Sequence, residues 1–233
     1  MFERRDLSAE MAQLRVERRA ADGPPIITGY GGVYYRAGEE GTQFRLFPDM
    51  IERIMPGAFD AAVREDDVRS FFNHQESQML GRRRPGDSKP TLTLSVDAVG
   101  LVYAATPPAT IVPANLPELI ERRDVDGSSM QFNVNAGTAK RGRAVWVEEI
   151  IDGISVSVRE VYDLELREVG PVVLPTYTAT TAERRGESRD YRALVAERDQ
   201  ARRQAEVPGA RISEEELRAR QLDVDAFLHR LND

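Results

Sequence analysis

The sequence predicts an α+β fold: an antiparallel β-barrel surrounded by a few helices and followed by a helical C-terminal tail. Three observations predict it. Residues 25–182 are rich in β-branched residues, Gly and Pro; several runs within them alternate apolar and polar residues; and short turn signals such as Asp152-Gly153 separate these runs. With 233 residues, 41% of them hydrophobic, the chain is long enough to bury a core.

Composition divides the chain into three parts. Residues 1–24 form a charged N-terminal segment, residues 25–182 form the predicted barrel domain, and residues 183–233 form a charged tail with almost no aromatic residues. Residues 183–206 hold 13 charges in 24 positions, which is too many to build a core alone. We therefore expect one folded domain with a short segment before it and a tail after it.

The strands are predicted in the following order. Residues 26–35 form the first extended run. The runs TLTLSVD and LVYAAT form a hairpin that turns at Val99-Gly100. The alternating run GSSMQFNVN covers residues 127–135, and a long run over residues 143–174 turns at Asp152-Gly153.

Two short helices are expected among these strands. One covers residues 57–63, just after Pro56, and the other covers residues 116–123, where Pro117 is tolerated in the first turn. Both are short compared with the strand runs, so the predicted fold stays dominated by β-structure.

The tail is predicted to form two helices separated by Pro208-Gly209. Ser213 and Glu216 form a capping box at the start of the second helix. Apolar residues line one face of that helix: Leu217, Val224, Phe227, Leu228 and Leu231. This face packs either on the same molecule or on a partner, and the sequence leaves both interpretations open.

Residue counts exclude several classes of function. Lys and Arg total 32 against 39 Asp and Glu, so the net charge is −7 and the chain is a poor candidate for binding nucleic acid. There is no cysteine, which excludes disulfides, thiolate zinc sites and a cysteine nucleophile, and which suits a reducing cytosol. Because His74 and His229 are the only histidines, a multi-histidine metal centre is excluded too, and we expect no cofactor.

No membrane segment is expected. The first residues are charged throughout and lack the apolar run of a signal peptide. The longest uncharged stretch, residues 98–117, contains four prolines that would repeatedly break a lipid-exposed helix. We interpret it as a strand followed by a loop.

Once cysteine nucleophiles and metal centres are excluded, catalysis by serine or carboxylate side chains remains. His74 ends the run of residues 68–74 at the rim of the predicted barrel, where an imidazole can act as a general base. In the run 127–135, alternation places Ser128 with the apolar residues and Ser129 on the polar face, where a hydroxyl can meet a substrate. Taken alone, a structural histidine and a serine pair at the end of a turn are the commoner explanations of these residues.

Glu168 is the third candidate. It shares the parity of Leu164 and Leu166, so an unbroken strand would point it inward, where a buried carboxylate needs a partner such as His74. The alternative is that the strand ends or bulges before Glu168, because Gly170-Pro171 follows directly.

Eight pieces of the chain, in order, carry a family resemblance. They are LRVERR at 14–19, ITGY at 27–30, IMPGAFD at 54–60, FNH at 72–74, LGR at 80–82, GL at 100–101, DVDGSSMQF at 124–132 and EVGPVVLPTY at 168–177. In these pieces the chain resembles the prohead maturation proteases of tailed bacteriophages, serine proteases that resemble the herpesvirus assemblins in having a β-barrel surrounded by helices. The resemblance runs from about residue 14 to about residue 184, and the C-terminal tail of residues 183–233 falls outside it.

The resemblance implies an assemblin-like fold, with His74 as the base, Ser129 as the nucleophile and Glu168 as the third catalytic member. The chain departs from the family at five positions: Gln75 replaces a frequent Asp, Met130 and Gln131 replace the usual Phe and Gly, Gly170 replaces a common Ser, and Thr176 replaces a common Ala. None of these removes a proposed catalytic group, but Gln131 is expected to reshape the cleft beside Ser129.

The function implied is that of a serine endopeptidase made during phage assembly. It would lie inside the immature prohead in the host cytoplasm, cleave scaffold segments of its partner, the major capsid protein, and finally cleave itself. Self-association is a further option, and backbone amides near residues 141–143 are candidates for the oxyanion hole. The alternative is a catalytically silent assembly or scaffolding protein that keeps the barrel as a capsid-binding module.

Overall fold

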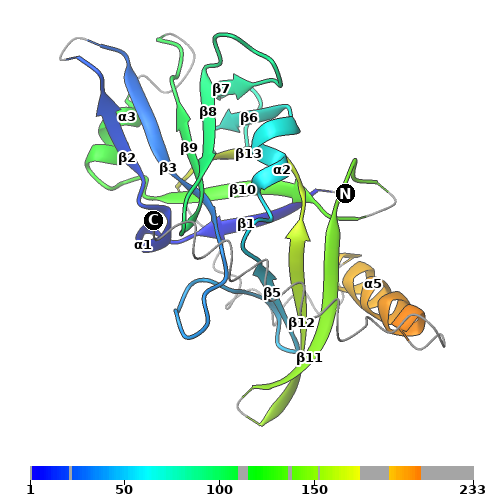
Figure 1. Ribbon diagram of the computed structural model, residues 1–233. Coiled ribbons are helices and arrows are strands. Elements are labelled where there is room, and N and C mark those ends of the chain that lie inside the picture. The colour runs from blue at the N-terminus through cyan, green and yellow to red at the C-terminus, as the bar shows by residue number, and fades with distance from the viewer. Residues whose placement is uncertain are drawn as a thin grey trace.

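The alternating runs form strands in three sheets, which Figure 1 shows in the computed structural model. The structure describes residues 2–20, 23–109, 115–135, 138–151, 153–173 and 189–205. The helices of this part of the chain are α1 (Ala9–Ala12), α2 (Asp60–Glu65), α3 (Leu116–Glu121) and α5 (Arg189–Ala205). The two short helices predicted within the β-rich part correspond to α2 and α3, and Pro117 lies in the first turn of α3 as expected.

A five-stranded sheet contains the strands that carry the candidate residues. Its order is β1 (Glu3–Leu7), β10 (Gly127–Asn133), β13 (Glu165–Val172), β6 (Val68–Phe71) and β7 (Met79–Arg83). β10 runs antiparallel to both of its neighbours, whereas β13 and β6 are parallel. Two runs far apart in the sequence thus become adjacent central strands, and the chain that follows β6 emerges beside β13.

Two four-stranded sheets complete the described structure. One has the order β11 (Arg143–Ile151), β12 (Ile154–Asp163), β5 (Met50–Ile54) and β4 (Phe44–Phe47). The other has the order β2 (Arg15–Arg18), β3 (Pro25–Val33), β9 (Gly100–Ala105) and β8 (Leu92–Val96). The predicted hairpin around Val99-Gly100 corresponds to β8 and β9, and the one around Asp152-Gly153 to β11 and β12.

The predicted antiparallel barrel is wrong in two respects. The three sheets are open, and the pairs β5–β12 and β6–β13 are parallel. Alternation shows which residues of a strand face the core, but it does not show which strands pair, so closure could not be inferred from it. The helices in the described ranges are also too few and too short to surround the sheets, and an assemblin-like fold is not established.

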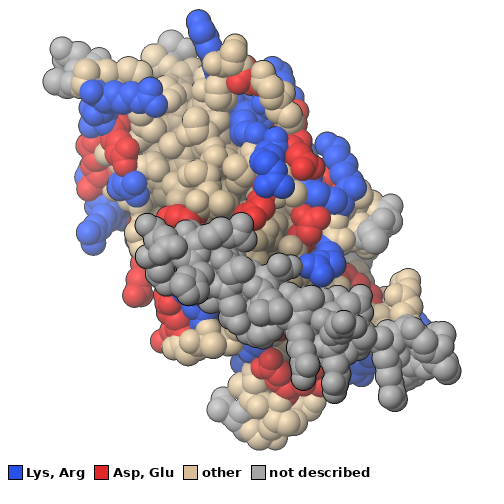
Figure 2. Space-filling model, viewed as in Figure 1, with Lys and Arg blue, Asp and Glu red and all other residues tan. Residues whose placement is uncertain are grey.

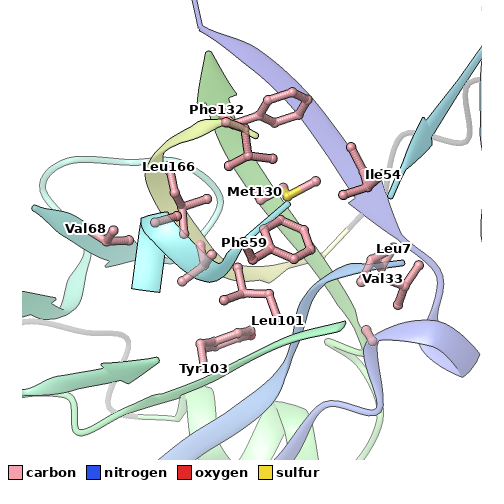
Figure 3. Close-up of a cluster of buried hydrophobic side chains, with 14 of the residues drawn as sticks. Leu7, Val33, Ile54, Phe59, Val68, Leu101, Tyr103, Met130, Phe132 and Leu166 are labelled. Carbon is pink, nitrogen blue, oxygen red and sulfur yellow. The ribbon is translucent and has the colours of Figure 1, made fainter. Parts of the chain in front are cut away.

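The core lies where the sheets meet (Figure 3). The core residues labelled there come from seven strands (β1, β3, β5, β6, β9, β10 and β13) and from Phe59, the residue that precedes α2; Figure 3 shows Phe59 close to Met130 of β10. The fully or almost fully buried members drawn include Leu7, Val33, Ile54, Val68, Leu101, Tyr103, Phe132 and Leu166. Because β10 supplies Met130 and Phe132, the strand that carries Ser129 is anchored at the centre of the core.

A buried ion network ties β1 to the rest of the molecule. Arg5 of β1 donates through Nε and Nη2 to the carboxylate of Glu52 on β5, at 2.6 and 2.9 Å, and Arg159 of β12 donates to the same carboxylate at 2.9 Å. Glu3 accepts from both arginines, at 2.8 and 2.7 Å. Since Glu52 and Arg159 have no exposed side-chain surface, these bonds replace the water that the charges lose on folding.

Replacing Glu3 with Gln is expected to remove part of the acid sensitivity of folding. Burial raises the pKa of Glu3, but Arg159 and Arg5 outweigh burial and hold the pKa below its usual value of 4.5. A carboxylate with a lowered pKa adds stability above its unfolded pKa, and that stability is lost as the pH falls through the folded pKa. We expect Glu3→Gln to lose roughly 2 kcal/mol at neutral pH.

Urea unfolding at neutral pH and at about pH 3 checks this, because an unfolded carboxylate is mostly protonated at the lower pH. The difference between Glu3→Gln and the unchanged protein should shrink at the lower pH. An equal difference at both pH values would show that the charge of Glu3 contributes nothing to the fall of the free energy of unfolding at acidic pH.

Part of the tail packs on the β11–β12 sheet. Glu197 of α5 accepts two hydrogen bonds of 3.0 Å from Arg159 and one of 3.4 Å from the indole of Trp146. The first predicted tail helix therefore corresponds to α5, whereas the second, which begins near Ser213, lies outside the described residues. No helix in the described ranges is long and apolar enough to span a bilayer.

Charges of both signs cover the face shown in Figure 2. The described Lys and Arg side chains on that face are interspersed with Asp and Glu side chains, beside a broad uncharged area. On this part of the surface, the described residues do not form the one-sided basic stripe that typifies nucleic-acid binding.

Candidate active site

Strand β10 directs its two consecutive serines to opposite faces of the five-stranded sheet. Ser128 shares a face with the buried Met130, and its hydroxyl lies 3.0 Å from the hydroxyl of Tyr103 in the core. Ser129 and Gln131 lie on the other face. This is the alternation expected from the sequence, except that Ser129 is fully buried instead of open to solvent.

Glu168 reaches the same face as Ser129 because β13 contains a β-bulge. Phe132 pairs with Leu166 and Gln131 pairs with Glu168, so Arg167 is an extra residue on β13. The extra residue reverses the alternation, so that Leu166 packs in the core while Glu168 lies across from Gln131. The expectation that Glu168 points to the same side as Leu166 is wrong. The alternative, a bulge before Glu168, is what the structure contains.

Gly170 allows the segment that carries His74 to cross this face closely. A Cβ atom at residue 170 would lie 2.0 Å from the carbonyl oxygen of Phe71, the last residue of β6. No side chain fits there without moving the backbone of β6. The departure of Gly170 from the common family residue Ser therefore has a direct steric reason in this chain.

His74 and Glu168 form a buried pair on this face. Nδ1 of His74 lies 2.7 Å from Oε1 of Glu168, and the two side chains are 9% and 4% exposed. The amide nitrogen of Gln131 lies 3.3 Å from the same ring nitrogen. The carboxylate is the strongest acceptor near Nδ1, and with the Nδ1 proton directed to it, Nε2 is an acceptor, which is the arrangement that a general base requires.

Two buried polar atoms at this site have no hydrogen-bond partner among the described residues. They are Nε2 of His74 and Oγ of Ser129. The bond between the imidazole and the hydroxyl is therefore not made in this structure, although both groups lie on the same side of the sheet. Buried polar atoms are nearly always paired, because leaving one unpaired costs about 1–3 kcal/mol, so two such atoms in one region point to a functional site.

The comparisons with known proteins agree with this chemistry. Residues 12–193 match the model of the family described as caudovirus prohead serine protease. The chain belongs to this family. Neither the comparison with curated proteins nor the comparison with solved structures found a match. The family resemblance predicted from the sequence is confirmed, and the matched range contains His74, Ser129 and Glu168.

Membership of the prohead protease family implies a serine peptidase that acts in capsid maturation. The catalytic groups of a serine peptidase are protein side chains and backbone amides. Separately, the described residues contain no cluster of three His, Cys, Asp or Glu side chains that is arranged to hold a metal ion. The site is thus built from side chains of β10, β13 and the turn after β6.

The sequence analysis assigned no role to Asn73, although this residue shapes the turn that presents His74. Asn73 and His74 both adopt left-handed backbone conformations, with φ of 51° and 59°, which Asn and His tolerate better than most residues. The Asn73 amide donates to the carbonyl oxygen of Pro171 at 3.0 Å, and its side-chain oxygen accepts from the amide of Val173 at 2.9 Å. The piece Phe72-Asn73-His74 of the family pattern was the available signal.

Asp66 is a second residue that the sequence analysis did not single out. Its carboxylate accepts from the Leu166 amide at 2.7 Å, immediately before the bulge, and from two nitrogens of Arg141 at 2.7 and 2.6 Å. The hydrogen bond with Asp66 raises the pKa of Arg141 although burial opposes the rise. Asp66 thereby fixes β13 next to Glu168, and a single Asp after a short helix carries no sequence signal of that contact.

Proposed function

We propose that this chain is the serine endopeptidase that matures the phage prohead, with Ser129 as nucleophile, His74 as general base and Glu168 as the group that orients His74. The observation that carries the proposal is the arrangement on one sheet face. Glu168 engages Nδ1 of His74 and leaves Nε2 unpartnered, and the neighbouring strand presents an unpartnered serine hydroxyl. Family membership supports the same assignment.

In the proposed mechanism, the hydroxyl of Ser129 attacks the peptide carbonyl carbon while Nε2 of His74 takes its proton. Glu168 accepts a hydrogen bond from the Nδ1–H group of His74 and stabilises the imidazolium that forms. His74 then protonates the leaving amine as the C–N bond breaks, which leaves an acyl-enzyme. A water molecule, deprotonated by His74, hydrolyses the ester and restores the serine. The amides near residues 141–143 stay our candidates for binding the oxyanion.

We propose scaffold segments of the major capsid protein and the chain itself as substrates. The position of Val173 supports self-cleavage. Its amide donates to the side-chain oxygen of Asn73, the residue before His74, so the chain directly after β13 lies beside the base. Cleavage after Val173 would separate the site from the tail without requiring a second molecule.

The alternative, a catalytically silent capsid-assembly module, is favoured by one observation. Ser129 is fully buried, and its bond to His74 is not made. Catalytic hydrogen bonds are often long before substrate binds, so a catalytic Ser129 is compatible with the same geometry.

Covalent labelling with diisopropyl fluorophosphate separates the two functions without a known substrate. An activated Ser129 should take one phosphoryl adduct, found on the peptide that contains residues 127–135 by mass spectrometry. We expect His74→Ala to slow the labelling by about 10³-fold, because the base is removed. The matched control is Ser128→Ala, which should label at the unchanged rate. An adduct at another residue, or equal rates with and without His74, would support the silent module.

A further inference from the structure

A pocket of about 610 Å³ lies on the same sheet face as the candidate catalytic residues. It is lined by Phe2, Asp66, Asp67, Arg69, Phe71, Glu76, Met79, Lys140, Glu165, Leu166 and Arg167. Two lining residues flank Glu168 directly: Arg69 pairs with Glu168 across β6 and β13, and Arg167 precedes it in the bulge. A peptide that reaches Ser129 and His74 therefore passes this pocket within a few residues.

Three of the acidic groups that line the pocket already have close partners. The carboxylate of Asp66 accepts two bonds from Arg141. Asp67 accepts from Arg82 at 2.8 Å and in a second, shorter contact, and the hydrogen bond from Arg82 lowers the pKa of Asp67 although burial opposes this. These carboxylates are neutralised within the protein.

Glu165 is engaged in the same way at the other side of the pocket. It accepts from the amide of Lys140 at 3.0 Å, and its second oxygen lies 3.8 Å from the ammonium of Lys140. Glu76, which is 80% exposed at the rim, is the acidic lining group that makes no close bond within the described ranges of the chain.

The arginines that line the pocket are much less satisfied. Among the residues that the structure describes, Arg69 contacts Asp67 at 3.4 Å, and Arg82 already engages that carboxylate. Arg167 pairs there with Glu76 at 3.6 Å, and exposed pairs of that length contribute little. Their side chains are 31% and 44% exposed, so both guanidinium groups remain available to an incoming carboxylate.

Apolar side chains complete the pocket. Phe2 and Met79 are 37% and 36% exposed, and Phe71 forms a buried part of the lining. The guanidinium of Arg167 lies 4.7 Å from the centre of the Phe2 ring. A stacked arginine keeps its hydrogen-bonding edge free, while apolar walls can cover the methylene stem of a bound side chain.

We propose that this pocket is a specificity subsite that binds an acidic side chain, Glu or Asp, of the substrate peptide a few residues from the scissile bond. The carboxylate binds to Arg69 and Arg167, and the stem packs against Phe2 and Met79. This proposal rests on the proposed peptidase function, because a substrate subsite requires a peptide substrate. The selectivity itself can be measured without hydrolysis.

The test uses the full-length Ser129→Ala protein and two fluorescein-labelled peptides, Ala-Leu-Ala-Glu-Ala-Leu-Ala and the same peptide with Gln in place of Glu. Fluorescence anisotropy should show the Glu peptide binding about tenfold more tightly, as expected for a charge-assisted contact. Because the whole protein has a net charge of −7, its overall charge repels the Glu peptide and would by itself favour binding of the neutral Gln peptide. Equal binding of the two peptides would overturn the proposal.

Three further variants of the Ser129→Ala protein locate the effect. Adding Arg69→Gln and Arg167→Gln together should abolish the preference for Glu. Arg45→Gln makes a single charge change on β4, away from the pocket lining, and should keep the preference. Glu76→Gln should strengthen Glu-peptide binding, because it removes the carboxylate that competes for Arg167. A preference that survives loss of both pocket arginines would place the acidic site elsewhere and refute the subsite.

Hydrolysis gives the second readout. The active full-length chain is incubated with a peptide library made from a digested proteome, and the cleaved bonds are identified by mass spectrometry. Glu or Asp should be enriched at one fixed position relative to the cleaved bond, and this enrichment should vanish in Arg69→Gln/Arg167→Gln. Cleavage without enrichment would refute the subsite and leave the peptidase function standing. Selective binding without any cleavage would refute the peptidase function and leave the acidic site standing.

Discussion

Ser129→Ala is expected to abolish hydrolysis of a co-expressed capsid or scaffold substrate, by about 10⁴-fold or more, without destabilising the fold. The reason for the first effect is the loss of the attacking oxygen. The reason for the second is that Oγ of Ser129 is buried and makes no hydrogen bond among the described residues, so its removal breaks no contact. Quantitative gel analysis of the cleaved substrate and thermal unfolding of the variant measure the two effects.

Ser128→Ala is the matched control, with the opposite expected outcome. Its hydroxyl bonds to the hydroxyl of Tyr103, whose pKa burial raises, so that this hydroxyl stays protonated. Removing Ser128 leaves the buried hydroxyl of Tyr103 unpaired, which should cost about 1–3 kcal/mol while much of the hydrolysis remains. Full hydrolysis by Ser129→Ala would contradict the assignment of the nucleophile. Loss of hydrolysis in both variants without loss of folding would contradict the separation of the two faces of β10.

Glu52→Gln is expected to destabilise the protein by about 3–5 kcal/mol, the range for breaking a buried ion pair. Glu52 is fully buried and accepts from both Arg5 and Arg159. The neutral amide leaves these two guanidinium groups undercompensated in a region that water does not reach. Because Arg5 lies on the strand next to β10, the change should also loosen the sheet that carries Ser129.

Glu149→Gln is the matched control for this change. Glu149 likewise pairs with an arginine through both carboxylate oxygens, but its side chain is 37% exposed. The same substitution there should cost about 1 kcal/mol or less, because water screens the partly exposed Glu149 and Arg53 keeps its hydrogen bond to Gln43. Urea denaturation at neutral pH measures both variants. Equal losses would show that burial does not set the strength of these pairs.

Several features of the site could be read from the sequence, because they depend on local order. Alternation in residues 127–135 separates Ser128 from Ser129 whatever strand lies beside them. The run that ends in Asn73-His74 places an imidazole directly after a strand, and β6 does end at Phe71. Local patterns of this kind also located α2, α3 and the two predicted hairpins.

Other features depend on contacts between distant segments, which no local pattern encodes. The bulge at Arg167 puts Glu168 on the face of Ser129, and it is held by Asp66, about a hundred residues earlier in the chain. A one-residue shift in a strand exchanges its two faces, so the direction of Glu168 followed from the bulge and not from the sequence parity.

The sequence alone shows the family of this chain and limits the catalytic groups that it offers. It contains no cysteine, it has one histidine in its β-rich part, and it keeps the ordered pieces of the prohead protease pattern around His74, Ser129 and Glu168. That the sheets stay open, and that two weakly paired arginines of the pocket lie next to Glu168, follows from the tertiary structure alone. The physical reason is that strand pairing, bulges and ion pairs are settled by the free energy of burying distant segments together, whereas residue type and alternation are properties of the chain alone.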